Sequence, residues 1–261
     1  MNRPPEARTL ITGASSGIGC ELARECARRG HSLVIVARRR EALSSLAEEL
    51  TERHRVAVDV VAADLVAPGA GVELVRRVSE LGVWIEHLVN NAGFGANGVF
   101  QDLSLEDQLS MLELNCAVVT ELTHRFLPPM LTRRRGRILN VASTAAFQPG
   151  PFMAVYYATK AYVLSLSEAL SEELRGTGVT VTALCPGATR TEFQSRANAD
   201  DMRLLRLGVA DARGVAEVGF RAMMAGKAIA IPGVKNKLLR QSVRFTPHAI
   251  VRRIVRLINS G

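Results

Sequence analysis

The chain is poor in the residues that build disulfide scaffolds and metal sites. Its four cysteines, at positions 20, 26, 116 and 185, form no Cys-x-x-Cys pair, and its five histidines are scattered without metal-ligand spacing. These absences argue against a disulfide framework and a bound metal, and they indicate reduced thiols in a protein core. We therefore expect no metal cofactor.

Long apolar runs are also missing. No stretch reaches the roughly 18 consecutive apolar residues of a transmembrane helix. The start of the chain, MNRPPEARTLITG, has no apolar segment of a signal peptide ahead of the first expected strand. The sequence therefore predicts a cytoplasmic protein.

Positive charge is in excess, with a formal net charge of +8. The arginines fall in separate clusters at 38–40, 133–135 and 252–256, without the interleaved aromatic residues of many nucleic-acid-binding surfaces. We expect a solvated basic surface and a site for an anionic cofactor, and no nucleic-acid partner.

What the chain has is an alternation of apolar runs and segments of helical periodicity. This alternation predicts an α/β fold, a Rossmann-like doubly wound parallel sheet of about seven strands with helices on both faces, in a single domain. We place that domain at 1–234 and treat 235–261 as a basic amphipathic helical extension of it. The expected strands are 8–12, 32–37, 56–62, 85–90, 136–142, 179–185 and 228–231. The expected helices are 17–29, 40–53, 71–81, 105–131, 153–176 and 211–226.

A glycine-rich turn, RTLITGASSGIGCELA, follows the first expected strand and opens the first helix. Gly13, Gly17 and Gly19 let the backbone turn tightly and let a pyrophosphate approach the free N–H groups of the helix start. Ser15 and Ser16 add hydroxyl donors. The position and composition of the turn predict a dinucleotide site.

The second expected strand, VIVARRREAL, indicates which dinucleotide is bound. An acidic residue at its end would hydrogen-bond the ribose of NAD, but Ala37 stands there and Arg38, Arg39 and Arg40 follow. Guanidinium groups bind a 2′-phosphate through charge-assisted hydrogen bonds. The sequence therefore favours NADP over NAD.

All three tyrosines gather beside one lysine, in YYATKAY at 156–162. On a helix, Tyr156 lies four residues and Tyr157 three residues before Lys160, so either ring could lie beside the ammonium. The spacing alone does not choose between them.

The motif TGASSGIG resembles the cofactor loop of the short-chain dehydrogenase/reductase family, and NNAG at 90–93 resembles a second family motif. The resemblance runs from about residue 8 to residue 231. It implies a nicotinamide cofactor, which the end of the second strand indicates to be NADP(H), and it extends the set of expected cofactor contacts. These residues are Gly13, Ser15, Ser16, Gly17, Ile18, Gly19, Arg38, Arg39, Asp64, Leu65, Asn91, Ala92, Gly93, Tyr156, Lys160, Pro186, Gly187, Thr189 and Thr191.

The same resemblance selects Tyr156 as the reacting tyrosine, because the family pattern is Tyr-x-x-x-Lys. It implies a catalytic set of Asn115, Ser143, Tyr156 and Lys160, in which Ser143 holds the substrate oxygen and Asn115 supports a water that links Lys160 to solvent. A phenol has a pKa near 10, and a neighbouring ammonium lowers it toward working pH. Tyr157 and Tyr162 are then expected to pack, near a subunit contact.

The resemblance predicts an oxidoreductase that interconverts a carbonyl group and its alcohol by hydride transfer, with Tyr156 as general acid/base. The loops 94–100, 144–153 and 190–205 carry Phe94, Phe147, Phe152, Met153, Phe193 and Leu204, which suit a hydrophobic substrate. Two alternatives stay open. One is reduction of a 3-oxoacyl group on acyl carrier protein, docked by Arg133, Arg134, Arg135 and Arg175. The other is a non-catalytic NADP(H)-binding redox sensor.

Family resemblance and the two long helices, 105–131 and 153–176, predict a homodimer or homotetramer. In the tail, TPHAIVRRIVRLINSG, we expect Thr246 to cap a helix that begins at Pro247. Its apolar face would comprise Ile250, Val251, Ile254, Val255, Leu257 and Ile258, opposite Arg252, Arg253 and Arg256. Such a helix can pack on the body or a neighbouring subunit, which is commoner in soluble enzymes, or make weak contact with an anionic membrane surface.

Overall fold

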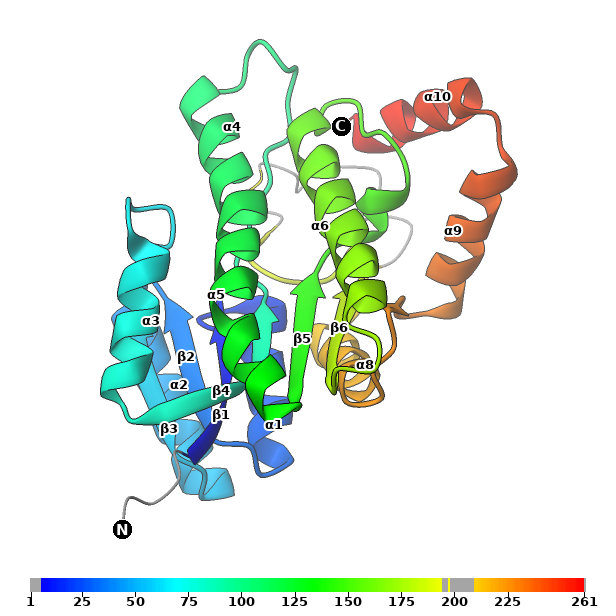
Figure 1. Ribbon diagram of the computed structural model, residues 1–261. Helices are drawn as coiled ribbons and strands as arrows, with labels where there is room; N and C mark the ends of the chain where they lie inside the picture. The colour runs from blue at the N-terminus through cyan, green and yellow to red at the C-terminus, as the bar shows by residue number, and fades with distance from the viewer. Residues whose placement is uncertain (1–5, 194–196, 198–208, 261) are drawn as a thin grey trace.

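The computed structural model describes residues 6–193, 197 and 209–260. Its centre is one sheet in which all neighbouring strands are parallel, in the order β3-β2-β1-β4-β5-β6-β7 (Figure 1). The strands are β1 (Glu6–Thr12), β2 (Leu33–Ala37), β3 (Val58–Ala62), β4 (Val83–Asn90), β5 (Gly136–Val141), β6 (Val179–Leu184) and β7 (Ile229–Ala230). The predicted Rossmann-like doubly wound fold is confirmed.

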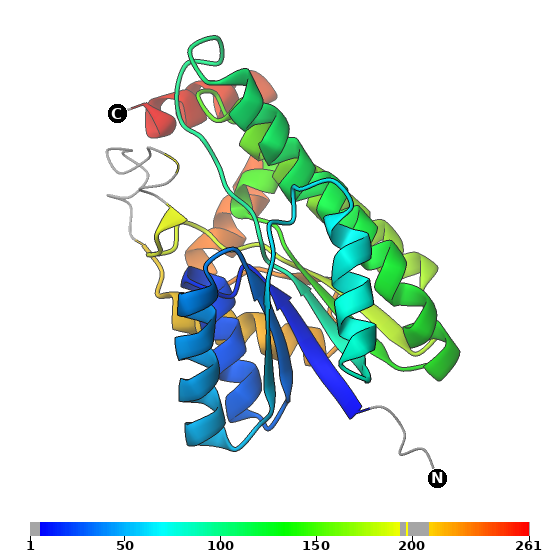
Figure 2. The same cartoon turned by 90° about the vertical axis from the view of Figure 1, so that its left-hand side faces the viewer.

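Helices cover both faces of the sheet (Figure 2). They are α1 (Gly17–Arg28), α2 (Arg40–His54), α3 (Ala70–Glu80), α4 (Leu105–Leu112), α5 (Val118–Arg133), α6 (Ala154–Glu173), α8 (Ala212–Met224), α9 (Val234–Phe245) and α10 (His248–Asn259). A π-helical turn, η1 (Glu113–Ala117), and a 3₁₀ turn, η2 (Thr144–Phe147), complete the described elements. The predicted helix 105–131 is therefore divided by η1 and continues to Arg133.

The strands are mostly apolar, and β2 (LVIVA) wholly so, because both faces of the sheet are buried. On one face Ile11, Ile35 and Leu139 pack against α1, α2 and α8, through residues such as Leu22 and Phe220. On the other face a second apolar cluster joins the sheet to α3, α5 and the end of α6. These two clusters form the core that fixes the carboxyl ends of the strands.

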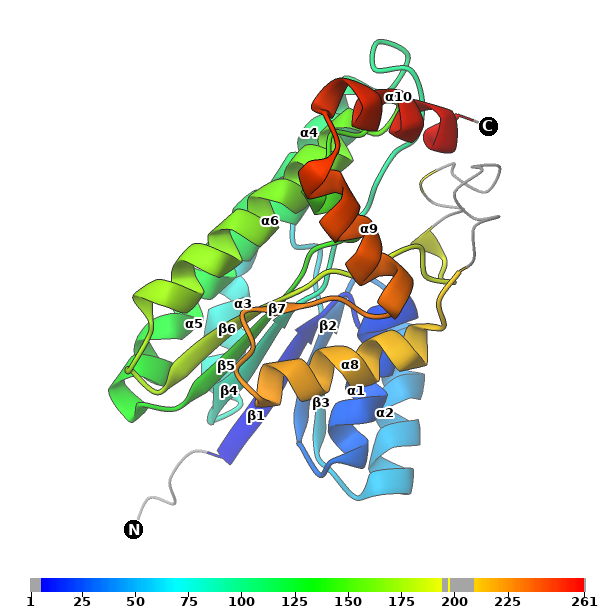
Figure 3. The same ribbon diagram turned by 90° about the vertical axis from the view of Figure 1, so that its right-hand side faces the viewer.

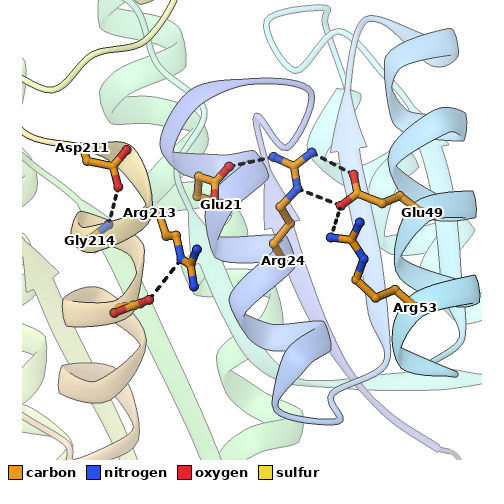
Figure 4. A network of polar contacts seen from close by, with 8 residues as sticks. Glu21, Arg24, Glu49, Arg53, Asp211, Arg213 and Gly214 are labelled. Atoms are coloured by element: carbon orange, nitrogen blue, oxygen red, sulfur yellow. Dashed lines mark hydrogen bonds and ion pairs between the residues drawn. The ribbon is translucent and has the colours of Figure 1, made fainter.

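A polar bridge ties the first two helices together beside the glycine turn (Figure 4). The Arg24 guanidinium of α1 donates to both carboxylate oxygens of Glu49 on α2, at 3.1 and 2.8 Å, and to Glu21. Figure 4 also shows the start of α8, where the carboxylate of Asp211 accepts a hydrogen bond from the amide of Gly214. The Arg24–Glu49 bridge joins α1, which follows the glycine turn, to α2, while the Asp211 bond caps α8.

The chain after β7 forms two helices, α9 and α10, that stand beside the carboxyl end of the sheet (Figure 3). The expected cap is wrong: the hydroxyl of Thr246 donates to the carbonyl of Ser242 and closes α9, and Pro247 takes the cap position of α10. A residue before proline is held in an extended conformation, so Thr246 ends one helix and does not begin the next.

Candidate active site and cofactor cleft

The glycine turn leaves the start of α1 open to an anion. Ser16 caps α1 with an extended backbone but makes no capping bond through its side chain among the described residues, and the first turn carries no acidic residue. Gly13 has φ +67°, and a Cβ on Gly19 would lie 2.3 Å from the carbonyl oxygen of Gly13. The close contact between Gly13 and position 19 therefore requires glycine there. The turn leaves the free backbone N–H groups at the start of α1 open to an anion.

The NNAG segment after β4 holds this turn in place. The side-chain amide of Asn91 donates to the carbonyl oxygens of Thr12 and Gly13, at 2.9 and 3.2 Å. In return, the hydroxyl of Thr12 accepts from the backbone N–H groups of Asn91 and Ala92, both at 3.0 Å. Thr12 was missed from the sequence, because its hydroxyl reaches across strands that are far apart along the chain.

A cavity of about 740 Å³ runs from the glycine turn past the end of β5 to α9 and α10. Most of the residues singled out from the sequence line it. They are Gly13, Ser15, Ser16, Gly17, Ile18, Arg38, Arg39, Asp64, Leu65, Asn91, Ala92, Gly93, Ser143, Tyr156, Lys160, Pro186, Gly187, Thr189 and Thr191. The open helix start and the glycine cradle at one end fit the pyrophosphate of a dinucleotide.

Gly19 and Asn115, both in the described part of the chain, lie behind the cavity wall. Asn115 sits in the π-helical turn η1 and is buried. Its amide donates to the carbonyl of Phe94 at 2.9 Å and to the hydroxyl of Thr159 at 3.0 Å, and its oxygen accepts from the Phe94 N–H. Asn115 thus fixes the segment after NNAG against α6, while its role in a water relay stays a prediction.

Ser143, Tyr156 and Lys160 come together because β5 ends where α6 begins its first turns. The hydroxyl of Ser143 hydrogen-bonds Tyr156, and it also accepts from the N–H of Ala145 at 3.1 Å. The ammonium of Lys160 donates to the carbonyl of Val141 at 2.9 Å and lies 5.8 Å from the centre of the Tyr156 ring. The three side chains face one cavity.

Burial sets the protonation of this group. It raises the pKa of Tyr156 to about 12, against the smaller lowering effect of the hydrogen bond from Ser143. Burial likewise lowers the pKa of Lys160 to about 8. The expected lowering of the tyrosine pKa by the neighbouring ammonium is therefore wrong for the protein alone, because the loss of solvation outweighs it.

The other two tyrosines have separate contacts. Tyr157 is buried, meets the Tyr156 ring edge-on at 6.1 Å, and donates from its hydroxyl to the side-chain oxygen of Asn259 at 3.2 Å. Tyr162 is exposed, and its hydroxyl shares a hydrogen bond with that of Thr120 at 2.7 Å. Tyr156 is thus the member of the trio beside both Ser143 and Lys160.

The arginines after β2 border the glycine-turn end of the cavity. Arg39 donates to the backbone oxygen of Ser15 at 3.2 Å and to the carboxylate of Glu192 at 3.0 Å. Arg38 lines the same part of the cavity and is exposed. Asp64 accepts from the N–H of Val66 at 3.4 Å, which places its carboxylate after β3 as expected.

The opposite end of the cavity is apolar, and only half of the expected residues make it. Phe94, Met153 and Phe193 line the cavity. Phe147 and Phe152 instead pack under the cations of Arg240 and Arg256, and Leu204 lies outside the described residues.

The apolar wall is completed by residues of α9 and α10 that sequence reasoning missed as pocket residues. These are Leu239, Val243, Val251, Ile254, Val255 and Ile258. The signal was present in the apolar periodicity of the tail, which indicates a buried stripe but not what the stripe covers.

The four arginines expected to dock a carrier protein lie at the amino ends of the strands, just before β5 and β6 begin. Arg133 stacks on Trp84 at 4.8 Å, Arg134 donates to the carbonyl of Gly176, Arg135 pairs with Glu86, and Arg175 pairs with Glu172. The cavity opens at the carboxyl ends of the strands, so these cations do not border it.

Comparison with known proteins agrees with this geometry. The chain is 39% identical over 186 residues to sulfoacetaldehyde reductase 2 of Chromohalobacter salexigens, covering 70% of this chain and 73% of the relative. A short-chain dehydrogenase from Sphingobium yanoikuyae in complex with NADPH superposes with a TM-score of 0.81 at 34% identity, over 93% of this chain and 96% of the other. The bulky-bulky ketone specific alcohol dehydrogenase from Comamonas testosteroni gives 0.76 at 32% identity, over 93% and 94%.

The family model for short chain dehydrogenase matches residues 7–202, three quarters of the chain. That span includes the glycine turn, NNAG, Ser143 and the Tyr156–Lys160 pair, which converge on one cavity. The protein is an oxidoreductase that belongs to the short-chain dehydrogenase family.

Proposed function

We propose that the protein reduces bulky, hydrophobic ketones or aldehydes with NADPH, using Tyr156 as the general acid. One observation carries the proposal. Ser143, Tyr156 and Lys160 stand at the junction between the two parts of a single cavity, a glycine-lined part suited to a dinucleotide and an apolar part suited to a substrate.

When bound, NADPH supplies the hydride that adds to the carbonyl carbon. The chain's own residues handle the oxygen. Ser143 donates a hydrogen bond to it, and the hydroxyl of Tyr156 gives it a proton as the C–O bond becomes single. Because burial raises the pKa of Tyr156 to about 12, the phenol is protonated at neutral pH and ready to donate. The ammonium of Lys160 would stabilise the phenolate that remains.

The preference for NADPH rests on charge at the end of β2. Ala37 offers no carboxylate to repel a phosphate, and Arg38 and Arg39 border the cavity there. The Sphingobium relative is a complex with NADPH. The guanidinium of Arg39 donates to Ser15 and Glu192 in the protein alone. With cofactor bound, a 2′-phosphate would accept hydrogen bonds from this guanidinium.

The substrate class rests on the apolar end of the cavity. Phe94, Met153 and Phe193 line the cavity together with apolar residues of α9 and α10, which suits an apolar substrate. The Comamonas relative is specific for bulky-bulky ketones, which supports a substrate with apolar groups on both sides of the carbonyl.

The proposal is tested by following NADPH absorbance with a panel that contains aryl, steroid-like and long-chain ketones, carrier-bound and free 3-oxoacyl groups, and small anionic aldehydes. We expect the bulky apolar ketones to turn over. Tyr156→Phe should lower kcat by roughly 10²–10⁴-fold while NADPH still binds. Tyr162→Phe is the matched control, because it removes the same hydroxyl from the exposed face of α6.

Three results would contradict the proposal. Turnover confined to carrier-bound substrate would favour the acyl-carrier alternative, and turnover of small anionic aldehydes alone would overturn the hydrophobic substrate class. Unchanged behaviour of Tyr156→Phe, with NADPH binding but no turnover in either protein, would favour a redox sensor.

A further inference from the structure

Most of the net positive charge of the protein lies in α9 and α10. Residues 234–260 contain seven lysines and arginines and no aspartate or glutamate, and the whole chain has a net charge of +8. The rest of the chain is therefore close to neutral. The seven cations are Lys235, Lys237, Arg240, Arg244, Arg252, Arg253 and Arg256.

The same two helices expose large apolar side chains. All of α9 is described, and none of its residues is buried. Val234, Leu238 and Phe245 recur at helical spacing along one side of it and are 71%, 66% and 76% exposed. On α10, Ile250, Ile254 and Leu257 are 48%, 48% and 61% exposed.

The helix α10 also has a second apolar stripe, which is buried. Val251 and Val255 pack against Met153 and Tyr157, and Asn259 is fully buried. The packing expected for the tail therefore accounts for one side of α10 only. The exposed stripe of Ile250, Ile254 and Leu257 is not used in that packing. It therefore remains available for contact with a second surface.

The exposed surface adjoins the opening of the cavity. Leu239 and Ile254 line the cavity and are also about half exposed, so the cavity opens beside the apolar residues of α9 and α10. Figures 1 and 3 show both helices at the periphery of the molecule, next to the carboxyl end of the sheet. A hydrophobic ligand that arrives along this surface would meet the apolar end of the cavity.

We propose that α9 and α10 form a docking surface for an anionic membrane, on which the helices lie with their apolar residues between the lipid headgroups. Cations beside large apolar side chains are the pattern of helices that lie in a membrane interface. Within residues 6–193, 197 and 209–260, none of the helices is long and apolar enough to cross a membrane. The contact is therefore peripheral.

Charge decides against the other occupants. A second copy that met this surface with its own α9 and α10 would bring seven further cations against the first seven, without an acidic partner within either segment. A nucleic acid would leave Leu238 and Phe245 without apolar partners. The idea that membrane docking delivers substrate to the cavity rests on the proposed function. The docking itself does not depend on that function.

The test is co-sedimentation of the full-length protein with vesicles. We expect binding to vesicles of phosphatidylcholine with about 30% phosphatidylglycerol, and weak binding to pure phosphatidylcholine. Binding should fall steeply between about 0.05 and 0.5 M salt, because the attraction is screened. Docking does not require turnover, so this measurement is independent of the NADPH assay.

Two sets of variants separate the contributions. Lys235→Gln with Lys237→Gln should weaken vesicle binding by about fivefold for each cation removed. Leu238→Ser with Phe245→Ser should weaken it by at least tenfold, with the vesicle-free reductase rate retained, since neither residue lines the cavity. The matched control is Lys227→Gln with Val72→Ser, which removes an exposed cation and an exposed apolar residue elsewhere.

Each other outcome overturns the proposal. Full-length protein that stays in the supernatant at low salt shows that the surface does not bind membranes. Equal binding by the Leu238→Ser, Phe245→Ser variant shows a charge-only contact, as expected for a polyanion. A doubled mass in light scattering that the same variant abolishes shows that a second copy covers the surface.

Discussion

Burial keeps the hydroxyl of Tyr156 protonated, which favours its role as proton donor in carbonyl reduction. Burial also disfavours the phenolate, which alcohol oxidation requires as a base. We expect kcat/KM for reduction to be flat through neutral pH and to fall above about pH 8, where Lys160 loses its charge. For oxidation, kcat/KM should rise about tenfold per pH unit toward the tyrosine pKa. Steady-state profiles in both directions test this. An oxidation plateau below pH 8 would contradict it.

The charge of Arg39 is expected to discriminate between the two nicotinamide cofactors. Arg39→Ala should raise KM for NADPH by roughly 10- to 100-fold and leave KM for NADH nearly unchanged, because charge-assisted hydrogen bonds to the 2′-phosphate are lost. Arg40→Ala is the control, since Arg40 is exposed but does not line the cavity. Equal increases in KM for NADPH and NADH would show that Arg39 acts by stabilising the conformation of the glycine turn, through its bond to Ser15.

His87 is expected to make stability depend on pH. Burial lowers its pKa to about 3, and its ring hydrogen-bonds the hydroxyl of Thr9 at 3.0 Å. In the unfolded chain histidine takes up a proton below about pH 6.5. Its contribution is therefore complete above pH 6.5 and is lost as the pH falls toward 3, by up to about 5 kcal/mol.

Urea unfolding of wild type and His87→Gln at pH 7.5 and 5 measures this contribution. The wild type should lose more free energy of unfolding than the variant over that interval. His124→Gln, on the exposed side of α5, is the control. Parallel losses in all three proteins would mean that other groups cause the acid sensitivity.

At the scale of elements, Asn259 joins the end of α10 to the loops around the site. Its amide donates to the carbonyl of Pro151 at 2.9 Å, its side-chain oxygen accepts from Tyr157, and its backbone oxygen accepts from Asn97 at 3.2 Å. Because α10 forms part of the apolar wall, this junction connects the apolar end of the cavity to the neighbouring loops.

We expect Asn259→Ala to raise KM for a bulky ketone about tenfold, with kcat changed less than threefold, and to lower the free energy of unfolding by about 2 kcal/mol. The buried hydroxyl of Tyr157 and the carbonyl of Pro151 would lose their partner. Kinetics and thermal unfolding check both numbers, with Arg252→Ala as an exposed control on α10. A drop in kcat at constant KM would place the effect on the chemistry.

Another element-scale feature is an apolar surface on α4 and α6. Leu105, Leu109 and Leu112 are exposed on α4, and Tyr162 is exposed on α6. We predict that this surface is the contact of a homodimer or homotetramer, as expected from the family resemblance. Leu105→Asp with Leu109→Asp should give a monomer by light scattering at micromolar concentration. A monomeric wild type would contradict the prediction.

For the whole molecule, the sheet and the composition of the cavity could be predicted because they follow from local patterns. Apolar runs mark strands buried on both faces, and Gly13, Gly17 and Gly19 mark a turn whose backbone no other residue allows. Tyr156 could be chosen over Tyr157 by family resemblance and not by spacing, since both positions lie near Lys160 on a helix.

The features that could not be predicted from the sequence depend on contacts between distant parts of the chain. The π-helical turn around Asn115 has the same apolar periodicity as the helix it interrupts, so the sequence does not show it. The pKa of Tyr156 is raised mainly by burial, which depends on how the folded chain excludes water and is not visible in any motif. The role of α9 and α10 in the cavity wall likewise depends on where the tail returns to the body.

The position of β1 between β2 and β4 has a consequence for synthesis on the ribosome. Gly13 and Asn91, which bond each other in the finished site, are 78 positions apart. At about 5–20 residues per second, translation leaves one edge of β1 unpaired for roughly 4–16 s before β4 emerges. An open apolar strand edge recruits other chains. We expect the nascent protein to need a chaperone during this interval, and its refolding yield in vitro to fall as protein concentration rises.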